Sequence, residues 1–282
     1  MPHKVRPVEQ ALTLAGLVLA GLFVLIPIYG FAQLAFDASL TGQPLEFRLW
    51  PKTFSLTVFQ AVWGRVAAGQ TFAGALRNSL AVSGGAAALS LALGARMAYV
   101  FARLRFPGHR AGLLALLVGA MLPPVALMTP LYLLLTALKI RTTLLGLAVV
   151  YTAFAMPFGV WNMRAAFQAV PRELEESAFL DGASPWRAFW SITLPLALPA
   201  IGVAALLAFL TGYTEFAMGW LFVEKSDNVT LAMATSSYIS QSSITWNQLA
   251  ALALLMSLPV VVIFLLVQRS LLSGLLGGVV DE

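Results

Sequence analysis

Residues 170–195 read VPRELEESAFLDGASPWRAFWSITLP and form the most informative local pattern of the chain. Pro171 suits the first position of a helix, and the acidic residues after it complement the positive N-terminal end of a helix dipole. Gly182 fits the left-handed position that ends many helices. Ser184 then offers an N-cap oxygen, and Pro185 a new first position. The stretch therefore predicts two short helices around a tight turn.

The first predicted helix runs from about Pro171 to Asp181, and the second leads straight into an apolar block. On the first helix Leu174 and Ala178 lie four residues apart on one face, while Glu175 and Glu176 project elsewhere. A unit of this kind is suited to lie against a partner protein.

The composition around this stretch indicates a lipid environment. Of 282 residues, 60% are hydrophobic and 10% are charged, whereas soluble proteins have roughly 45 to 50% and about 25%. The absence of cysteine excludes a disulfide framework and a thiolate metal site. The net charge of +5 does not indicate nucleic-acid binding, because Lys and Arg are scattered between apolar blocks.

Six blocks approach the length of about 20 apolar residues that a spanning helix needs. They run approximately over residues 11–35, 79–101, 111–138, 143–163, 196–222 and 249–267. None has the period-two alternation of barrel strands, and lipid leaves no backbone group unpaired. We therefore expect an all-α, polytopic membrane protein with six spans, a cytoplasmic helix-turn-helix loop, and both termini on one side.

Cationic residues give the orientation, because they flank spans on the cytoplasmic side. Four regions agree, namely those of Lys4 and Arg6, of Arg103, Arg105 and Arg110, of Arg164, Arg172 and Arg187, and of Arg269. Lys139 and Arg141 disagree, since they fall in a connection that this topology places outside. We expect a cytoplasmic tail over 1–10, a transmembrane domain over 11–270 with its cytoplasmic loop at 164–195, and a cytoplasmic tail over 271–282, in a cell (inner) membrane.

Several features of the spans leave alternatives open. Residues 83–88 (SGGAAA) give the second block a small-residue face for a neighbouring backbone. Pro123, Pro124, Pro130 and Pro157 interrupt the third and fourth blocks, and such kinks fit either helix packing or a transport path. The external segment 36–78 is long enough for a short amphipathic helix.

Glu215 is the one acidic residue well within an apolar block, and intramembrane charge is a functional hypothesis by default. It either lines a translocation path with Tyr213 or braces a gate, or else the helix breaks after Thr214 and leaves Glu215 near a wet end.

The pattern of the opening stretch resembles the EAA loop of permeases from binding-protein-dependent ABC importers. That signature is Glu-Ala-Ala, three residues, Gly, nine residues, then Ile-x-Leu-Pro. Here it falls on Glu176, Ser177, Ala178, Gly182, Ile192, Leu194 and Pro195, with every spacing intact and only Ser177 departing. The resemblance implies that the loop, with Glu175 and Asp181, docks into a cytoplasmic ATP-hydrolysing subunit and couples it to the spans.

Within that family the chain is similar to the sugar-importer branch, most of all to the smaller, six-span permease of maltose/maltodextrin systems. Asn78-Ser79-Leu80, Thr214-Glu215 and the ending after Ile263 carry this resemblance. It implies four partners: a second homologous permease, an ATP-binding cassette ATPase dimer, an extracytoplasmic sugar-binding protein, and the lipid membrane. Segment 223–248 would then dock the binding protein, through residues such as Tyr238, Gln241 and Trp246. The acidic C-terminal tail either reaches the ATPase interface or is a solvated terminus.

No G-x-x-x-x-G-K-[ST] phosphate loop occurs, so ATP and magnesium are expected on the partner ATPase and no cofactor on this chain. His3 and His109 lie far from paired carboxylates, which disfavours a metal site or triad chemistry. The chain is thus expected to be no enzyme. An ion-coupled secondary transporter is the main alternative, and a membrane-embedded enzyme, which would need converging catalytic groups, is a second.

Overall fold

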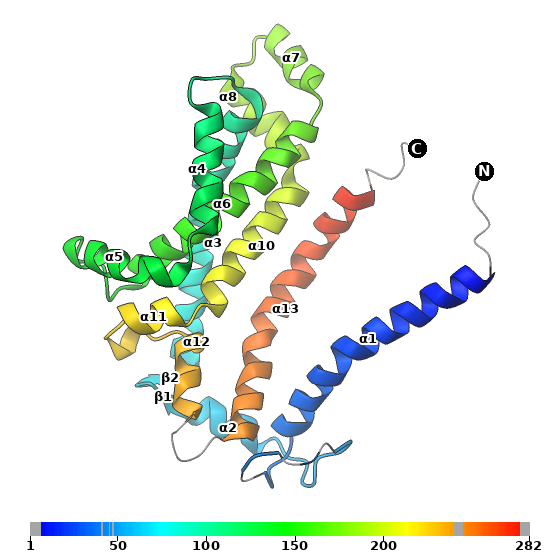
Figure 1. Cartoon of the computed structure of the whole chain (residues 1–282), viewed down its shortest axis with the longest axis vertical. Coiled ribbons are helices and arrows are strands. Elements are labelled where there is room, and N and C mark those ends of the chain that lie inside the picture. Colours follow the sequence, from blue (N-terminus) through cyan, green and yellow to red (C-terminus); the bar gives the residue numbers. More distant parts are fainter. Residues whose placement is uncertain (1–6, 41, 45, 47, 240–244, 277–282) are drawn as a thin grey trace. The chain divides into compact units, whose positions relative to one another are not determined.

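A computed structural model describes residues 7–40, 42–44, 46, 48–239 and 245–276, and it is predominantly helical (Figure 1). The chain divides into two compact units. The first comprises Met1–Ala67 with Thr235–Ser257, and the second Ala68–Ala234 with Leu258–Glu282.

The first unit is formed from two separate parts of the chain. Its elements are α1 (Pro7–Ala35), α2 (Thr57–Gly64), the two-residue strand β1 (Val66–Ala67), the 3-10 turn η3 (Thr235–Tyr238) and the start of α13 (Trp246–Leu276). The short helix expected in the external segment is α2, whose Val58 and Val62 are buried.

The second unit is built around three helices that pack side by side (Figure 1): α3 (Phe72–Arg103), α6 (Leu144–Ala169) and α10 (Leu198–Thr214). Its remaining elements are β2 (Gln70–Thr71), α4 (His109–Met121), α5 (Pro124–Ala137), α7 (Arg172–Leu180), α8 (Pro185–Ala188), the π turn η1 (Phe189–Thr193), α9 (Leu194–Leu196), α11 (Ala217–Phe222), η2 (Ser226–Asn228) and α12 (Leu231–Ala234). Figure 1 shows α7 and α8 at one end of this unit and α11 and α12 at the other.

The expected polytopic all-α class is confirmed, but two of the six spans are not straight. Within the described residues, four helices are long and apolar enough to cross a membrane: Val8–Ala35, Phe72–Arg103, Leu144–Ala169 and Trp246–Gln268. Two further pairs qualify only as bent units, α4 with α5 at 101° and Pro185–Leu196 with α10 at 79°. The number reaches six if each bent pair counts as one span.

Proline causes the first of these bends. Helix α4 ends at Met121, Leu122 has an extended backbone, and Pro124 opens α5. Proline lacks the donor that would continue the helix and disfavours a helical residue before it. Pro130 and Pro157 instead lie inside continuous helices, so the expectation that all four prolines interrupt spans is wrong for these two.

The fifth predicted block differs most. The chain bends at Ala197, before α10, so the second short helix does not lead straight into a span. Helix α10 then ends at Thr214, because Glu215 has an extended backbone, and α11 follows as a separate helix. Of the two alternatives for this region, the helix break is therefore confirmed.

Small residues allow the central helices to approach closely. A Cβ placed on Gly212 of α10 would lie 3.2 Å from the Cα of Ser83 on α3, and Ser83 and Ala86 are fully buried. Gly84, by contrast, has no neighbour within 4 Å of such a Cβ. The packing face therefore consists of residues three or four apart on successive turns of α3, such as Ser83 and Ala86, and not of the whole run 83–88, as helical periodicity requires.

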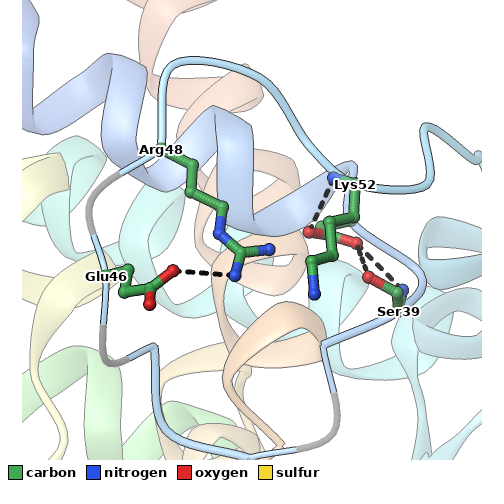
Figure 2. A network of polar contacts seen from close by, with 5 residues as sticks. Ser39, Glu46, Arg48 and Lys52 are labelled. Carbon is green, nitrogen blue, oxygen red and sulfur yellow. Dashed lines mark hydrogen bonds and ion pairs between the residues drawn. The ribbon is translucent and has the colours of Figure 1, made fainter.

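Figure 2 shows Ser39, Glu46, Arg48 and Lys52 in a polar network of the loop after α1, and this loop is organised by Asp37. Its carboxylate accepts hydrogen bonds from the backbone and hydroxyl of Ser39, at 2.9 and 2.6 Å, and from the backbone N–H of Lys52 at 3.1 Å. Nearby, Arg48 donates to Glu46 at 2.9 Å. Burial raises the pKa of Asp37, but the hydrogen bonds outweigh it, and the net pKa lies below its ordinary value.

We expect Asp37→Asn to lower the thermal midpoint of the purified protein at neutral pH by an amount corresponding to on the order of 1 kcal/mol. Because the folded-state pKa is lowered, the contribution is complete above the unfolded pKa, about 3.9, and is lost as pH falls through the folded value. Melting curves of both proteins at stepwise lower pH measure this. A midpoint difference that does not shrink on acidification would contradict the role of the charge.

Candidate functional site

The turn after α7 has the geometry that its sequence predicts. The N–H of Ala183 donates to the carbonyl of Ala178 at 2.9 Å, and that of Gly182 to Phe179 at 3.0 Å. These two bonds form a Schellman motif, in which the residue after the C-cap is left-handed. Gly182 has a φ of +84°, so the predicted role of this glycine is confirmed.

The second short helix also begins as predicted. The Ser184 hydroxyl accepts a hydrogen bond from the N–H of Arg187 at 3.2 Å, and Pro185 is in the first turn of α8. Helix α8 passes directly into η1, where the backbone widens into a π turn. Residues 172–196 therefore form a helical hairpin, here called the coupling loop, that ends at the bend before α10.

A buried ion pair joins this loop to α3. The Nε of Arg103, the last residue of α3, donates to Glu175 Oε1 at 3.0 Å, and both side chains are only 6% exposed. Arg103 also donates through Nη2 to the carbonyl of Val170 at 2.8 Å. The Thr193 hydroxyl donates to the same Glu175 oxygen. The sequence places Glu175 on a different face from Leu174 and Ala178, and this internal cation and hydroxyl hold Glu175 inside the protein.

An aromatic cluster makes a second attachment. Phe189 is 1% exposed, and its ring centroid lies 4.8 Å from that of Tyr99 on α3 and 6.0 Å from that of Phe167 on α6. Edge and tilted arrangements at these distances add to the burial of apolar area. The start of the loop is thus held by charge and its end by packing.

The outer surface of the coupling loop combines exposed apolar side chains with charges of both signs, since Arg172 and Arg187 are exposed as well as the acidic residues. Leu180 is 90% exposed and Trp186 52%, and Glu176 and Ser177 are exposed. Large exposed apolar side chains rimmed by polar groups are typical of protein interaction sites. The other predicted loop residues lie as follows: Asp181, Gly182 and Pro195 exposed, Ala178, Ile192 and Leu194 half-buried.

Glu215 caps a helix at the opposite end of the unit. It accepts hydrogen bonds from the N–H groups of Met218, at 2.9 Å, and Gly219, at 3.1 Å, and from the Tyr151 hydroxyl at 2.8 Å. The carboxylate therefore binds the start of α11 to α6. Tyr213 is 2% exposed and stacks on Phe209 with ring centroids 5.3 Å apart, so its ring is not on an open path.

Of the two cations that disagree with the charge pattern, Lys139 and Arg141, the second forms an ion pair. Arg141 donates to Glu224 at 2.8 Å, in the loop after α11. The hydrogen bond and the charge of Arg141 lower the pKa of Glu224. Asn228 Nδ2 joins the same region to the carbonyl of Thr142 at 2.6 Å. Arg141 thus acts as a local partner of its neighbouring loop, which explains why it departs from the pattern.

In the first unit, Arg65 contacts Tyr238, an aromatic residue of the segment predicted to dock a binding protein. Its guanidinium lies 4.3 Å above the ring of Tyr238 and donates to Gln248 at 2.7 Å. Tyr238 is 3% exposed and lies inside this unit, and its contact with a binding protein stays a prediction. Trp246 is half-buried, and Gln241 lies outside the described residues.

Comparisons with known proteins identify relatives of the whole arrangement. Residues 90–275 match the profile of a family described as "Binding-protein-dependent transport system inner membrane component". The maltose/maltodextrin transport system permease protein MalG of Salmonella typhimurium is 35% identical over 208 residues, or 72% of this chain and 70% of that protein. The trehalose transport system permease protein SugB of Mycobacterium tuberculosis is 29% identical, over 92% of this chain and 93% of that one.

A solved structure shares the fold. A chain in the crystal structure of a bacterial ABC transporter involved in the import of the acidic polysaccharide alginate aligns with a TM-score of 0.75 and 18% identity. The alignment covers 94% of this chain and 98% of that one. Among the residues that the structure describes here, no three Asp, Glu or His side chains gather as metal ligands would.

We expect Glu175→Gln to destabilise the protein by about 3 to 5 kcal/mol, because Arg103 would remain buried without its counter-charge. Arg103→Gln should cost a similar amount. The double variant should recover part of the loss, since it leaves no buried charge unpaired. The thermal midpoints of the unchanged protein, the two single variants and the double variant form a double-mutant cycle. The exposed neighbour gives the control variant, Glu176→Gln. Strictly additive losses would show that the two side chains do not interact.

Proposed function

The chain belongs to the family of binding-protein-dependent transport system inner membrane components, and on that premise we propose that it is the permease subunit of an ABC importer for a di- or oligosaccharide. It is a multi-pass inner membrane protein of a transporter family, and its part in transport is to form the path and not to hydrolyse ATP. The proposed substrates are of the maltose, maltodextrin or trehalose kind.

The observation that carries the proposal is the coupling loop. It projects from one end of the second unit (Figure 1), and its exposed side chains include large apolar groups and charges of both signs, while its base is fixed by the Glu175–Arg103 pair. A surface that is rigid beneath and apolar outside suits a cleft on an ATP-hydrolysing subunit. This face carries the spacing from Glu176 to Pro195 that the importer signature requires.

The two attachments of the loop provide a route for force. Displacement of α7 would pull on Arg103 at the end of α3, and displacement of η1 would move Phe189 against Tyr99 and Phe167. Both therefore act on α3, and the second also acts on α6. ATP binding on the partner can then favour one arrangement of these helices over another, because it stabilises the two states unequally.

We infer the remaining assembly from the relatives. MalG and SugB are named as permeases of maltose/maltodextrin and trehalose transport systems, which supports a saccharide substrate. We propose a second homologous permease that completes the path, two ATPase subunits that bind ATP and magnesium, and an extracytoplasmic sugar-binding protein. The coupling loop and both termini would then be cytoplasmic, and segment 223–248 would face the binding protein.

An ion-coupled mechanism finds no support. The sequence feature that favoured it is Glu215, the one acidic residue well within an apolar block. The carboxylate of Glu215 accepts hydrogen bonds from the Tyr151 hydroxyl and from two backbone N–H groups of α11. A carboxylate so bound serves as a helix cap. Family membership favours the ATP-driven importer as well.

Gly182→Val should uncouple ATP hydrolysis from uptake. The strain comes from the backbone, because φ is +84° while no atom lies within 4 Å of an added Cβ, and a β-branched residue is penalised at a left-handed position. Gly182→Asn is the matched control, since Asn tolerates this conformation. We expect at least a tenfold loss of uptake per ATP hydrolysed for Val and little loss for Asn. If the Val and Asn variants gave the same uptake per ATP hydrolysed, coupling would not depend on the left-handed backbone at residue 182.

Affinity co-purification of the tagged chain from its native membrane tests the function itself. We expect an ATPase subunit, a second permease and a sugar-binding protein to co-elute, and the purified complex to hydrolyse ATP. The ligand of the binding protein then identifies the substrate. Recovery of the chain alone, active in vesicles without ATP, would overturn the proposal in favour of a secondary transporter.

A further inference from the structure

An open hollow of about 700 Å³ lies beside the base of the coupling loop. It is lined by the end of α3, the loop to α4, the first turn of α4, the last turns of α6 and the first residue of α7. Its lining includes five arginines, which are Arg103, Arg105, Arg110, Arg164 and Arg172.

Among the residues that the structure describes, one of these five arginines forms an ion pair with a carboxylate. Arg103 pairs with Glu175 and thus adds little net charge to the hollow. Arg164 donates its Nε to the Phe101 carbonyl at 3.2 Å, which satisfies a hydrogen bond but not the charge. Within the described part of the chain, neither Arg164 nor Arg105, Arg110 or Arg172 has a carboxylate at ion-pair distance. Four cations that share one hollow repel each other unless an anion joins them.

Several arginines that line one hollow fit one ligand chemistry especially well. The fork of arginine donors matches the oxygens of a phosphate, and several arginines can bind different oxygens of the same group. A carboxylate holds its two oxygens in one plane, whereas the tetrahedral phosphorus of a phosphodiester directs two charged oxygens and two ester oxygens toward donors on different sides. The charges therefore indicate a phosphate or a phosphodiester.

The walls and the location indicate that this phosphate belongs to a lipid. Leu104 is 52% exposed and Phe106 37%, and both line the hollow next to the basic residues. The hollow lies where α3 and α6, two spanning helices, end. Lipid phosphates occupy this level of a membrane, with apolar chains beside them, and basic pockets between spanning helices bind anionic head groups. A free phosphate would gain nothing from the exposed apolar walls.

We propose that this arginine pocket binds the phosphodiester head group of an anionic lipid. Arg172 is the first residue of α7, and Arg105 belongs to the loop after α3. A phosphodiester between them links the coupling loop to the spans beside the Arg103–Glu175 pair and braces the base of the loop. That the lipid comes from the cytoplasmic leaflet rests on the proposed function. Binding itself rests only on the geometry of the pocket.

The test uses the tagged full chain in detergent, with whatever subunits accompany it. Phosphatidylglycerol, phosphatidylcholine or inorganic phosphate is added, and native mass spectrometry counts retained lipid while melting curves report stabilisation. We expect phosphatidylglycerol to be retained and to raise the thermal midpoint, and the other two to do neither. Arg105→Gln with Arg110→Gln should weaken retention on the order of tenfold, since each basic residue near a membrane contributes severalfold.

Arg187→Gln is the matched control, because Arg187 is exposed on the neighbouring α8 but does not line the pocket. It should retain lipid as the unchanged protein does. Single Arg110→Gln gives the same comparison if the double variant does not fold. Three results would overturn the proposal: equal retention by pocket and control variants, stabilisation by inorganic phosphate equal to that by lipid, or a pocket filled by a co-eluting protein that excludes lipid. None of these depends on ATP hydrolysis or uptake, so they are distinguishable from a failure of the importer assignment.

Discussion

The ion pair between Arg103 and Glu175 is the interaction on which the functional end of this protein depends. Both side chains are almost fully buried, and the Val170 carbonyl and the Thr193 hydroxyl complete their hydrogen bonding. The free energy of desolvating two charges offsets most of their attraction, so a buried ion pair contributes little net stability compared with a well-packed apolar pair. Removal of either partner nevertheless destabilises the protein strongly, because the other charge stays buried and unpaired. The pair therefore fixes a position more than it adds stability. It makes the start of the coupling loop and the end of α3 move together.

The aromatic contact of Phe189 with Tyr99 and Phe167 attaches the other end of the loop. With both ends held, the exposed middle of the loop, including Leu180 and Trp186, is presented to a partner without depending on that partner for its shape. The breaks at Pro123, Ala197 and Glu215 complement this arrangement. The first follows from the donor that proline lacks, and at the last the Glu215 carboxylate caps the helix that follows.

The sequence predicted what depends on local chemistry and missed what depends on distant partners. The left-handed Gly182, the Ser184 cap and the spans were readable, because turn residues, capping oxygens and long apolar runs act within a few residues. Nothing near Glu175 indicated that an arginine 72 residues earlier would turn it inward. Its only signal was a basic residue at the end of an apolar block. The burial of Tyr238 under Arg65 was missed for the same reason, and the pattern of apolar residues gave no sign of the bend at Ala197.

The central claim is that the exposed face of the coupling loop docks on an ATPase subunit. The chain contains no cysteine, so a single one at Ser177, labelled with a photoactivatable cross-linker, reports its contacts in the native membrane. Ser226 provides the comparison, because it is exposed and its neighbour Asp227 contacts Asn78 near the start of α3, whereas the coupling loop contacts Arg103 at the end of α3. The account predicts that position 177 cross-links to an ATP-binding subunit and position 226 does not. Cross-linking of position 177 only to lipid, or of both positions to the same partner, would contradict it.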